Sequence, residues 1–153
     1  MKRFAVLIVM MMFLPAAAGY CTEVSLSAVM GKTGQMIEVP VTVDRVAKLA
    51  GVKLILTYDA EVLTFKEGNK TPQTQSLMHI VNDKKPGRLT IVMAGARGIS
   101  GKDVRLMNLI FHVKKGLKNH PKSRIEIIEI QLMGDDLKEI KASSRGCTII
   151  TAP

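Results

Sequence analysis

The side chains that could do chemistry are few and widely spaced in this sequence. The three histidines, His79, His112 and His120, have no cysteine or carboxylate at the spacing that metal ligands need. The chain also has no glycine-flanked serine elbow, no phosphate-binding loop and no Cys–His signature. We therefore expect a protein that is not an enzyme, with no catalytic residue, no metal ligand and no cofactor.

The nearest approach to an acid–base pair is formed by the adjacent carboxylates Asp135 and Asp136. They follow Gly134 between two apolar segments, where aspartate is favoured because its side chain accepts hydrogen bonds from the turn backbone. Glu126 and Glu129 lie among isoleucines and are expected on the solvent face of a strand. We interpret all four carboxylates as turn and surface residues.

The N-terminus predicts export. Lys2 and Arg3 give the first three residues a positive charge. Residues 4–14 are all apolar, and Pro15 precedes the small residues 16–18. This is the pattern of a secretory signal peptide cut after residue 18, and the apolar run is short of the roughly 20 residues that span a bilayer. We predict a signal peptide over residues 1-18 and one domain over residues 19-153, exported to a periplasmic or extracellular site without stable membrane insertion after cleavage.

The net charge of +9 favours acidic partners only weakly. Export argues against nucleic acid, and most of the charge is spread along the chain, as solubility alone would require. The one basic cluster could meet an acidic partner or lipid head groups, although such a run is more often a solvated loop. Its members are Lys114, Lys115, Lys118, Lys122 and Arg124.

The two cysteines, Cys21 and Cys147, stand near opposite ends of the predicted mature chain. In an oxidising compartment they could form a disulfide, which would stabilise the fold by about 4–5 kcal/mol in the chain-entropy model. They could equally be two unrelated thiols. Lipidation of Cys21 is a third reading, which the bulky Tyr20 directly before it disfavours.

Short runs of alternating apolar and polar residues, separated by glycine, proline and charged turns, predict an all-β domain. About nine such strands in one domain favour a two-sheet sandwich or jelly roll. Pro40 indicates an edge or a bulge, and the adjacent apolar Ile127 and Ile128 predict a β-bulge. The predicted strands are 23–29, 36–43, 51–58, 62–65, 78–81, 89–94, 106–113, 125–132 and 145–151.

The order of several short motifs resembles the cohesin domain family over residues 23–151. The segment 49–59, LAGVKLILTYD, is followed by Val62-Leu63, and the segment 86–91 reads PGRLTI. The strand with Leu109-Ile110-Phe111 and the closing Gly146-Cys147-Thr148-Ile149 continue the series. The resemblance implies a nine-stranded jelly-roll β-sandwich whose first and last strands are parallel neighbours. It would place Cys21 and Cys147 at the starts of those two strands, which gives the disulfide hypothesis a geometric reason.

The resemblance also implies a non-catalytic, protein-binding role, with a partner held on the outer face of one sheet. Type I cohesins carry an asparagine and an aspartate near the start of the third strand, where this chain has Gly51 and Lys53. We therefore expect a dockerin-like protein of a different kind or another acidic surface as the partner. The implied partner-binding residues are Lys53, Ile55, Thr57, Thr90, Val92, Glu129 and Gln131.

Two other functions remain open from the sequence. Modules of this shape include carbohydrate-binding modules linked to polysaccharide degradation, which stack sugars on exposed aromatic side chains. The chain has no tryptophan, and Tyr20, Tyr58, Phe65 and Phe111 cannot build a flat platform, so a polysaccharide ligand is the less favoured reading. A structural accessory of a secretion or cell-envelope assembly is the third reading.

Overall fold

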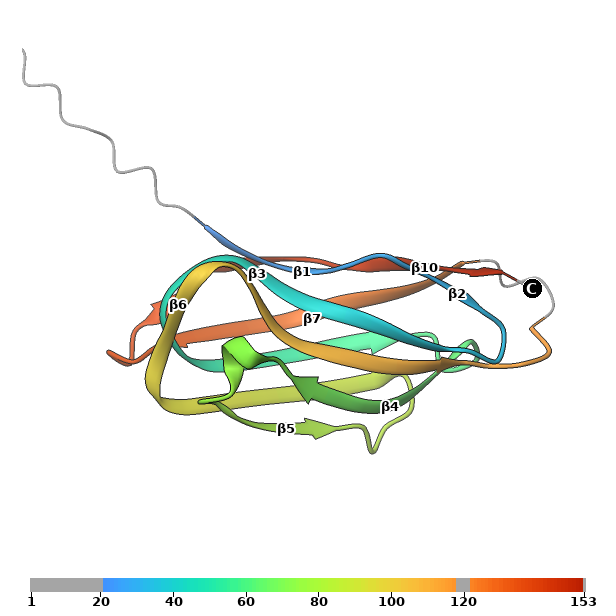
Figure 1. Ribbon diagram of the computed structural model, residues 1–153, viewed down its shortest axis with the longest axis horizontal. Helices are drawn as coiled ribbons and strands as arrows, with labels where there is room; N and C mark the ends of the chain where they lie inside the picture. Colours follow the sequence, from blue (N-terminus) through green and yellow to red (C-terminus); the bar gives the residue numbers. More distant parts are fainter. Residues whose placement is uncertain (1–20, 118–121, 153) are drawn as a thin grey trace, which may run out of the picture.

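The computed structural model describes residues 21–117 and 122–152, and it is built almost entirely of strands (Figure 1). The predicted signal peptide, 1-18, lies outside the described residues, as do Lys118 and His120. The elements are β1 (Thr22–Leu26), β2 (Val29–Lys32), β3 (Met36–Tyr58), β4 (Leu63–Lys70), the 3-10 turn η1 (Pro72–Thr74), β5 (Met78–Asn82), β6 (Arg88–Val113), β7 (Lys122–Gly134), β8 (Glu139–Ile140), β9 (Ala142–Arg145) and β10 (Cys147–Ala152).

Two long strands, β3 and β6, run antiparallel and pair from Met36 opposite His112 to Thr57 opposite Arg88. Both bend midway, around residues 44–50 of β3 and 95–103 of β6, where the ladder has two register shifts. Gly98 permits the bend, because a Cβ there would lie 2.3 Å from the backbone of Lys48. Each strand thus continues from one sheet into the other, where the sequence predicted two separate strands.

The two halves of β3 and β6 form the centres of two packed sheets (Figure 1). The first sheet has the order β5, β6 (88–94), β3 (51–58), β7, β10 and β2. The second has the order β4, β6 (104–113), β3 (36–43), β1 and β9. Each long strand counts as two when it is divided at its bend, and β1–β2 and β9–β10 each count as one interrupted strand. Counted in this way, the nine predicted strands of the jelly roll are confirmed. β8 is an additional strand of two residues.

Both irregularities predicted from the sequence have counterparts in the ladders. Opposite β3, Ile55 pairs with Glu129 while Leu56 pairs with Ile127, which leaves Ile128 as the extra residue of a β-bulge. Pro40 lies on a strand between β1 and β6, so the predicted edge is wrong, and the nearest bulge is the register shift between Val41 and Thr42.

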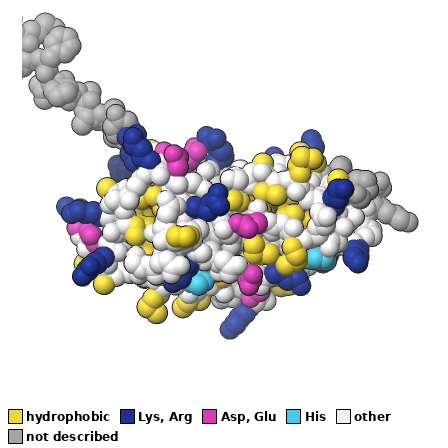
Figure 2. Space-filling view, in the orientation of Figure 1, with side chains coloured by type: hydrophobic (Ala, Val, Ile, Leu, Met, Phe, Trp, Pro, Cys, Tyr) yellow, Lys and Arg dark blue, Asp and Glu magenta, His cyan; other side chains and the backbone are white. Residues whose placement is uncertain are grey.

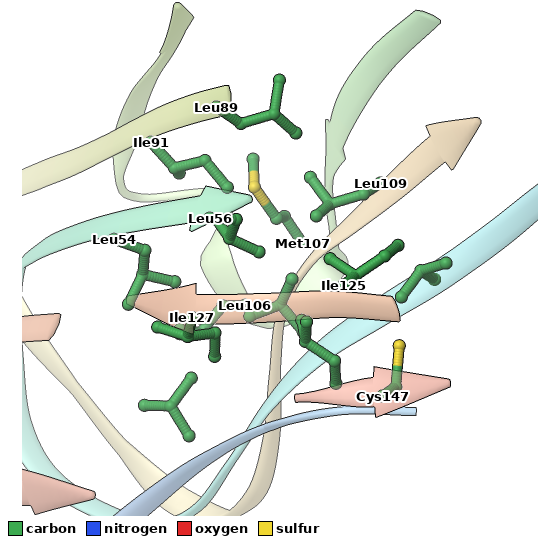
Figure 3. Packing of buried hydrophobic residues seen from close by; sticks show 14 of the residues in the cluster. Leu54, Leu56, Leu89, Ile91, Leu106, Met107, Leu109, Ile125, Ile127 and Cys147 are labelled. Carbon is green, nitrogen blue, oxygen red and sulfur yellow. The ribbon is translucent and has the colours of Figure 1, made fainter. Parts of the chain in front are cut away.

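The core is formed by inward-facing side chains of both sheets (Figure 3). Phe111 is fully buried at its centre and meets Tyr58 and Phe65 edge-on, with ring centroids 5.2 Å and 5.6 Å apart. Such T-shaped pairs are favoured because the positive ring edge meets the negative ring face. The described aromatic residues therefore pack against one another instead of forming a surface platform.

Replacing Phe111 by alanine is expected to lower the free energy of unfolding by about 3–5 kcal/mol, because it opens a cavity between the sheets and removes both ring contacts. Urea unfolding followed by circular dichroism measures the loss. The control is Ile150→Ala on β10, whose side chain is 44% exposed, with an expected loss below about 1 kcal/mol. Similar losses in the two variants would contradict this description of the core.

Candidate functional site

The seven predicted partner-binding residues lie together on the outer face of the first sheet. The register places Lys53 between Val92 on β6 and Gln131 on β7. The next row of the same face has Ile55 between Thr90 and Glu129. Thr57 follows on β3, between Arg88 and Glu126. We call this surface the outer face of the first sheet.

An ion pair joins the two rows at the centre of this face. Lys53 Nζ donates to Glu129 Oε1 at 2.6 Å, and the two side chains are 43% and 48% exposed. A pair this exposed contributes at most about 1 kcal/mol to stability, because water screens it. Because Glu129 compensates it, the charge of Lys53 is not an isolated positive charge on this face.

Ile55 was expected to be exposed on this face, and that prediction is wrong. Its side chain is 6% exposed, although it points away from the main core cluster. The physical reason is its place on a central strand between Thr90 and Glu129, with Glu129 drawn across by the ion pair to Lys53. A partner could reach Ile55 only if these neighbouring side chains moved.

Met78 and Ile80 on β5, and Ile128 on β7, are exposed apolar residues close to the seven predicted ones, and they were not assigned to this face from the sequence. Met78 and Ile80 on β5 are 79% and 69% exposed, and Ile80 pairs directly with Val92, which is 41% exposed. We call Met78, Ile80 and Val92 the apolar strip. Hydrophobic side chains emerge along the lower margin of Figure 2, where Figure 1 places β5. The alternation of Met78 and Ile80 was the available signal, but nothing in the sequence placed that strand at an edge.

The third of these residues, Ile128, owes its exposure to the β-bulge. Because the extra residue interrupts the alternation, Ile128 and Glu129 are both exposed, whereas Ile127 faces the core. Ile128 is 51% exposed, beside the Lys53–Glu129 ion pair. Exposed apolar side chains on one sheet face, here on both sides of an ion pair, are typical of protein-binding sites.

A cavity of about 560 Å³ lies at the bend of β3 and β6 and is lined by residues including Cys21, Arg45 and Ile140. Within residues 21–117 and 122–152 no three histidines, cysteines or carboxylates gather as metal ligands would. No helix in the same part of the chain is long and apolar enough to cross a membrane.

The predicted disulfide is not formed. Both cysteines are free, with Cys21 exposed and Cys147 buried. The first and last strands are parallel neighbours, as predicted, but Thr22 pairs with Ala142, so Cys21 lies beside Lys141. Cys147 comes several residues later, at the start of β10, which is too far for the Cα separation of less than about 7 Å that a disulfide requires.

The side chain of Cys147 points into the core, and Cys147 is paired with Ile125 of β7 (Figure 3). Burial raises the pKa of its thiol to about 11. At pH 8 only about one such thiol in a thousand is ionised, and the thiolate is the reactive form.

Iodoacetamide at pH 8 should therefore modify Cys21 in the folded protein and leave Cys147 unmodified. In denaturant without reductant, both thiols should react. Mass spectrometry of the intact chain counts the added groups in each condition. A chain that takes up no label in denaturant until it is reduced would show that a disulfide forms after all.

Comparisons with known proteins agree with the fold. The cohesin-domain family model matches residues 22–149. Among solved structures, a non-cellulosomal cohesin from the archaeon Archaeoglobus fulgidus has 22% identity and a TM-score of 0.77, over 88% of this chain and 93% of that one. The sixth cohesin of Acetivibrio cellulolyticus scaffoldin B, solved with a Cel5 dockerin mutant, has 19% identity and a TM-score of 0.77, over 87% of this chain and 100% of that one.

A type I cohesin–dockerin complex from Clostridium thermocellum has 16% identity and a TM-score of 0.76, over 87% of this chain and 100% of the other. No curated protein sequence matches this one. Since the family model covers most of the sequence, from β1 to β10, and the strand order agrees with it, the chain belongs to the cohesin family.

Proposed function

We propose that this chain is an exported, non-catalytic module that binds a protein partner on the outer face of the first sheet. The observation that carries the proposal is the apolar surface on that face, formed by the apolar strip and by Ile128. Burying apolar area of this kind contributes about 25 cal/mol per Å² to association before the entropic costs are subtracted. Export is supported by the leader sequence, 1-18, and suits a module that meets its partner outside the cytoplasm.

The partner is a dockerin-like protein or another protein with an apolar contact surface. Solved relatives such as the scaffoldin B cohesin and the Clostridium thermocellum cohesin were obtained in complex with dockerins. In this chain Lys53 is engaged by Glu129, so the partner's surface opposite that pair need not be acidic. The apolar residues Val92 and Ile128, at either side of the pair, are expected to contribute most of the binding free energy.

A polysaccharide ligand has less support. The described aromatic residues Tyr58, Phe65 and Phe111 pack against one another, so they are not arranged as a stacking platform. A role as a structural accessory of an envelope assembly would use the same face for a protein contact and differs only in the partner's identity.

The proposal is tested by passing the exported proteins of the host over the immobilised domain. Val92→Glu and Ile128→Glu should each weaken capture of the specific partner about ten-fold or more, because each would bury an unpaired carboxylate in the contact. The matched control is Met36→Glu, which changes an apolar residue 54% exposed on the second sheet. Mass spectrometry identifies the captured protein, and calorimetry with that protein measures each affinity.

The control should bind as tightly as the unaltered domain. Undiminished capture by both Val92→Glu and Ile128→Glu would contradict the assignment of this face. Tight binding to a polysaccharide array that none of the three changes affects would favour the carbohydrate-binding alternative.

A further inference from the structure

Most free sheet edges among the described residues carry features that discourage pairing with another chain. β4 pairs only with β6, and its edge has a register shift between Phe65 and Glu67 with charged Lys66 inside it. β9 pairs only with β1, has four residues and ends in Arg145. β2 has four residues and ends in Lys32, and β8 has only two residues. Short length, charge and bulges are the usual protections of an edge strand.

β5 is an edge strand without these protections. It pairs only with β6, over five residues from Met78 to Asn82, and its ladder has no register shift. Its sequence, MHIVN, contains no lysine, arginine, carboxylate or proline. The side chains of Met78 and Ile80, 79% and 69% exposed, are also among the most exposed apolar groups of the described residues. An edge that is regular, uncharged and apolar is a template for another strand.

Contacts at the start of β5 hold this edge in place. Just before the strand, Leu77 is fully buried, and its carbonyl accepts a hydrogen bond from Lys70 Nζ at 3.0 Å. The η1 turn that leads to it is tied to β6, because Thr74 Oγ1 donates to the carbonyl of Leu106 at 2.8 Å. Within the strand, a His79 ring nitrogen lies 3.1 Å from the carbonyl oxygen of Gly68 on β4. The edge is therefore preorganised for pairing.

We propose that β5 is a homodimer interface in which two copies of this chain pair antiparallel across a two-fold axis at Ile80. In that register Ile80 meets Ile80 of the second copy, and Met78 meets Asn82. A two-fold contact uses the same strand on both copies, so it closes at two and leaves no free edge for further growth. This proposal concerns the chain alone and stands independently of the partner proposed above.

Charges at the strand ends select this arrangement. The antiparallel register places Asp83 of one copy opposite Leu77 of the other, where the Lys70 ammonium already contacts the Leu77 carbonyl. Asp83 and Lys70 are thus brought together twice, once at each end of the paired strands. Lys84 falls opposite the uncharged Ser76, so the net positive charge of the chain does not place two cations face to face. Opposite charges near paired strands favour this register over shifted ones.

The dimer would join two first sheets edge to edge. Because strand pairing lies in the plane of the sheet, the outer faces remain open, and the two apolar strips become one continuous surface. A contact of five residues on each side buries less area than a standard interface, so we expect dissociation in the micromolar to millimolar range.

Sedimentation velocity of the purified exported protein, from about 5 µM to about 1 mM, should show a reversible shift from monomer to dimer. Ile80→Lys should raise the dimer dissociation constant about ten-fold or more, because it places two lysines face to face on the axis. The matched control, Met30→Lys on β2, changes an apolar residue that is 73% exposed and should leave dimerisation unchanged.

A charge exchange tests the register. Asp83→Lys and Lys70→Glu should each weaken the dimer several-fold, and the double variant should recover most of the loss. Circular dichroism shows whether each variant is folded. If Lys70→Glu fails to fold, Asp83→Lys, at an exposed position outside the strands, still tests the register. The proposal would be overturned by a monomer at every concentration or by assembly beyond two copies. It would also be overturned if Met30→Lys weakened the dimer as much as Ile80→Lys.

Discussion

The structure depends on one antiparallel ladder, between β3 and β6. Each of the two strands crosses from one sheet to the other at its bend, so the ladder aligns the two layers as well as the strands within them. The bend requires a close approach of Gly98 to the backbone of Lys48, which any larger residue would prevent. The same ladder also fixes the rows of the outer face, because Lys53 pairs with Val92 and Ile55 pairs with Thr90.

Strand positions and one irregularity could be predicted from the sequence, because burial of one sheet face makes apolar and polar residues alternate along each strand. The bulge at Ile128 was predictable for the same reason, since two adjacent apolar residues break that alternation. The continuity of β3 and β6 through the bend was not predictable. Gly95, Gly98 and Gly101 have the composition of a loop, and only the partner strand shows that the pairing continues.

The sequence predicted that the seven candidate residues share one sheet face, but it did not predict how their side chains are arranged there. Resemblance and alternation together placed all seven residues on one face, and the register brings them side by side. Alternation gives the direction of a side chain and says nothing of its neighbours, so the burial of Ile55 and the ion pair of Lys53 were missed. The disulfide was wrong for a similar reason: parallel pairing was correct, but its register, with Thr22 opposite Ala142, is not encoded in a local pattern.

The pairing of the first strands with the last has a consequence for how the chain folds. β1 and β2 find their parallel neighbours only in β9 and β10, at the far end of the sequence. Contacts between such distant segments form late, because the chain must lose the entropy of closing a long loop before these contacts can stabilise the fold. A chain formed from its N-terminus could assemble the central ladder once residue 113 is free, yet the sandwich would stay open at one side until β9 and β10 were added. The fold is therefore complete only when β9 and β10 have paired with β1 and β2.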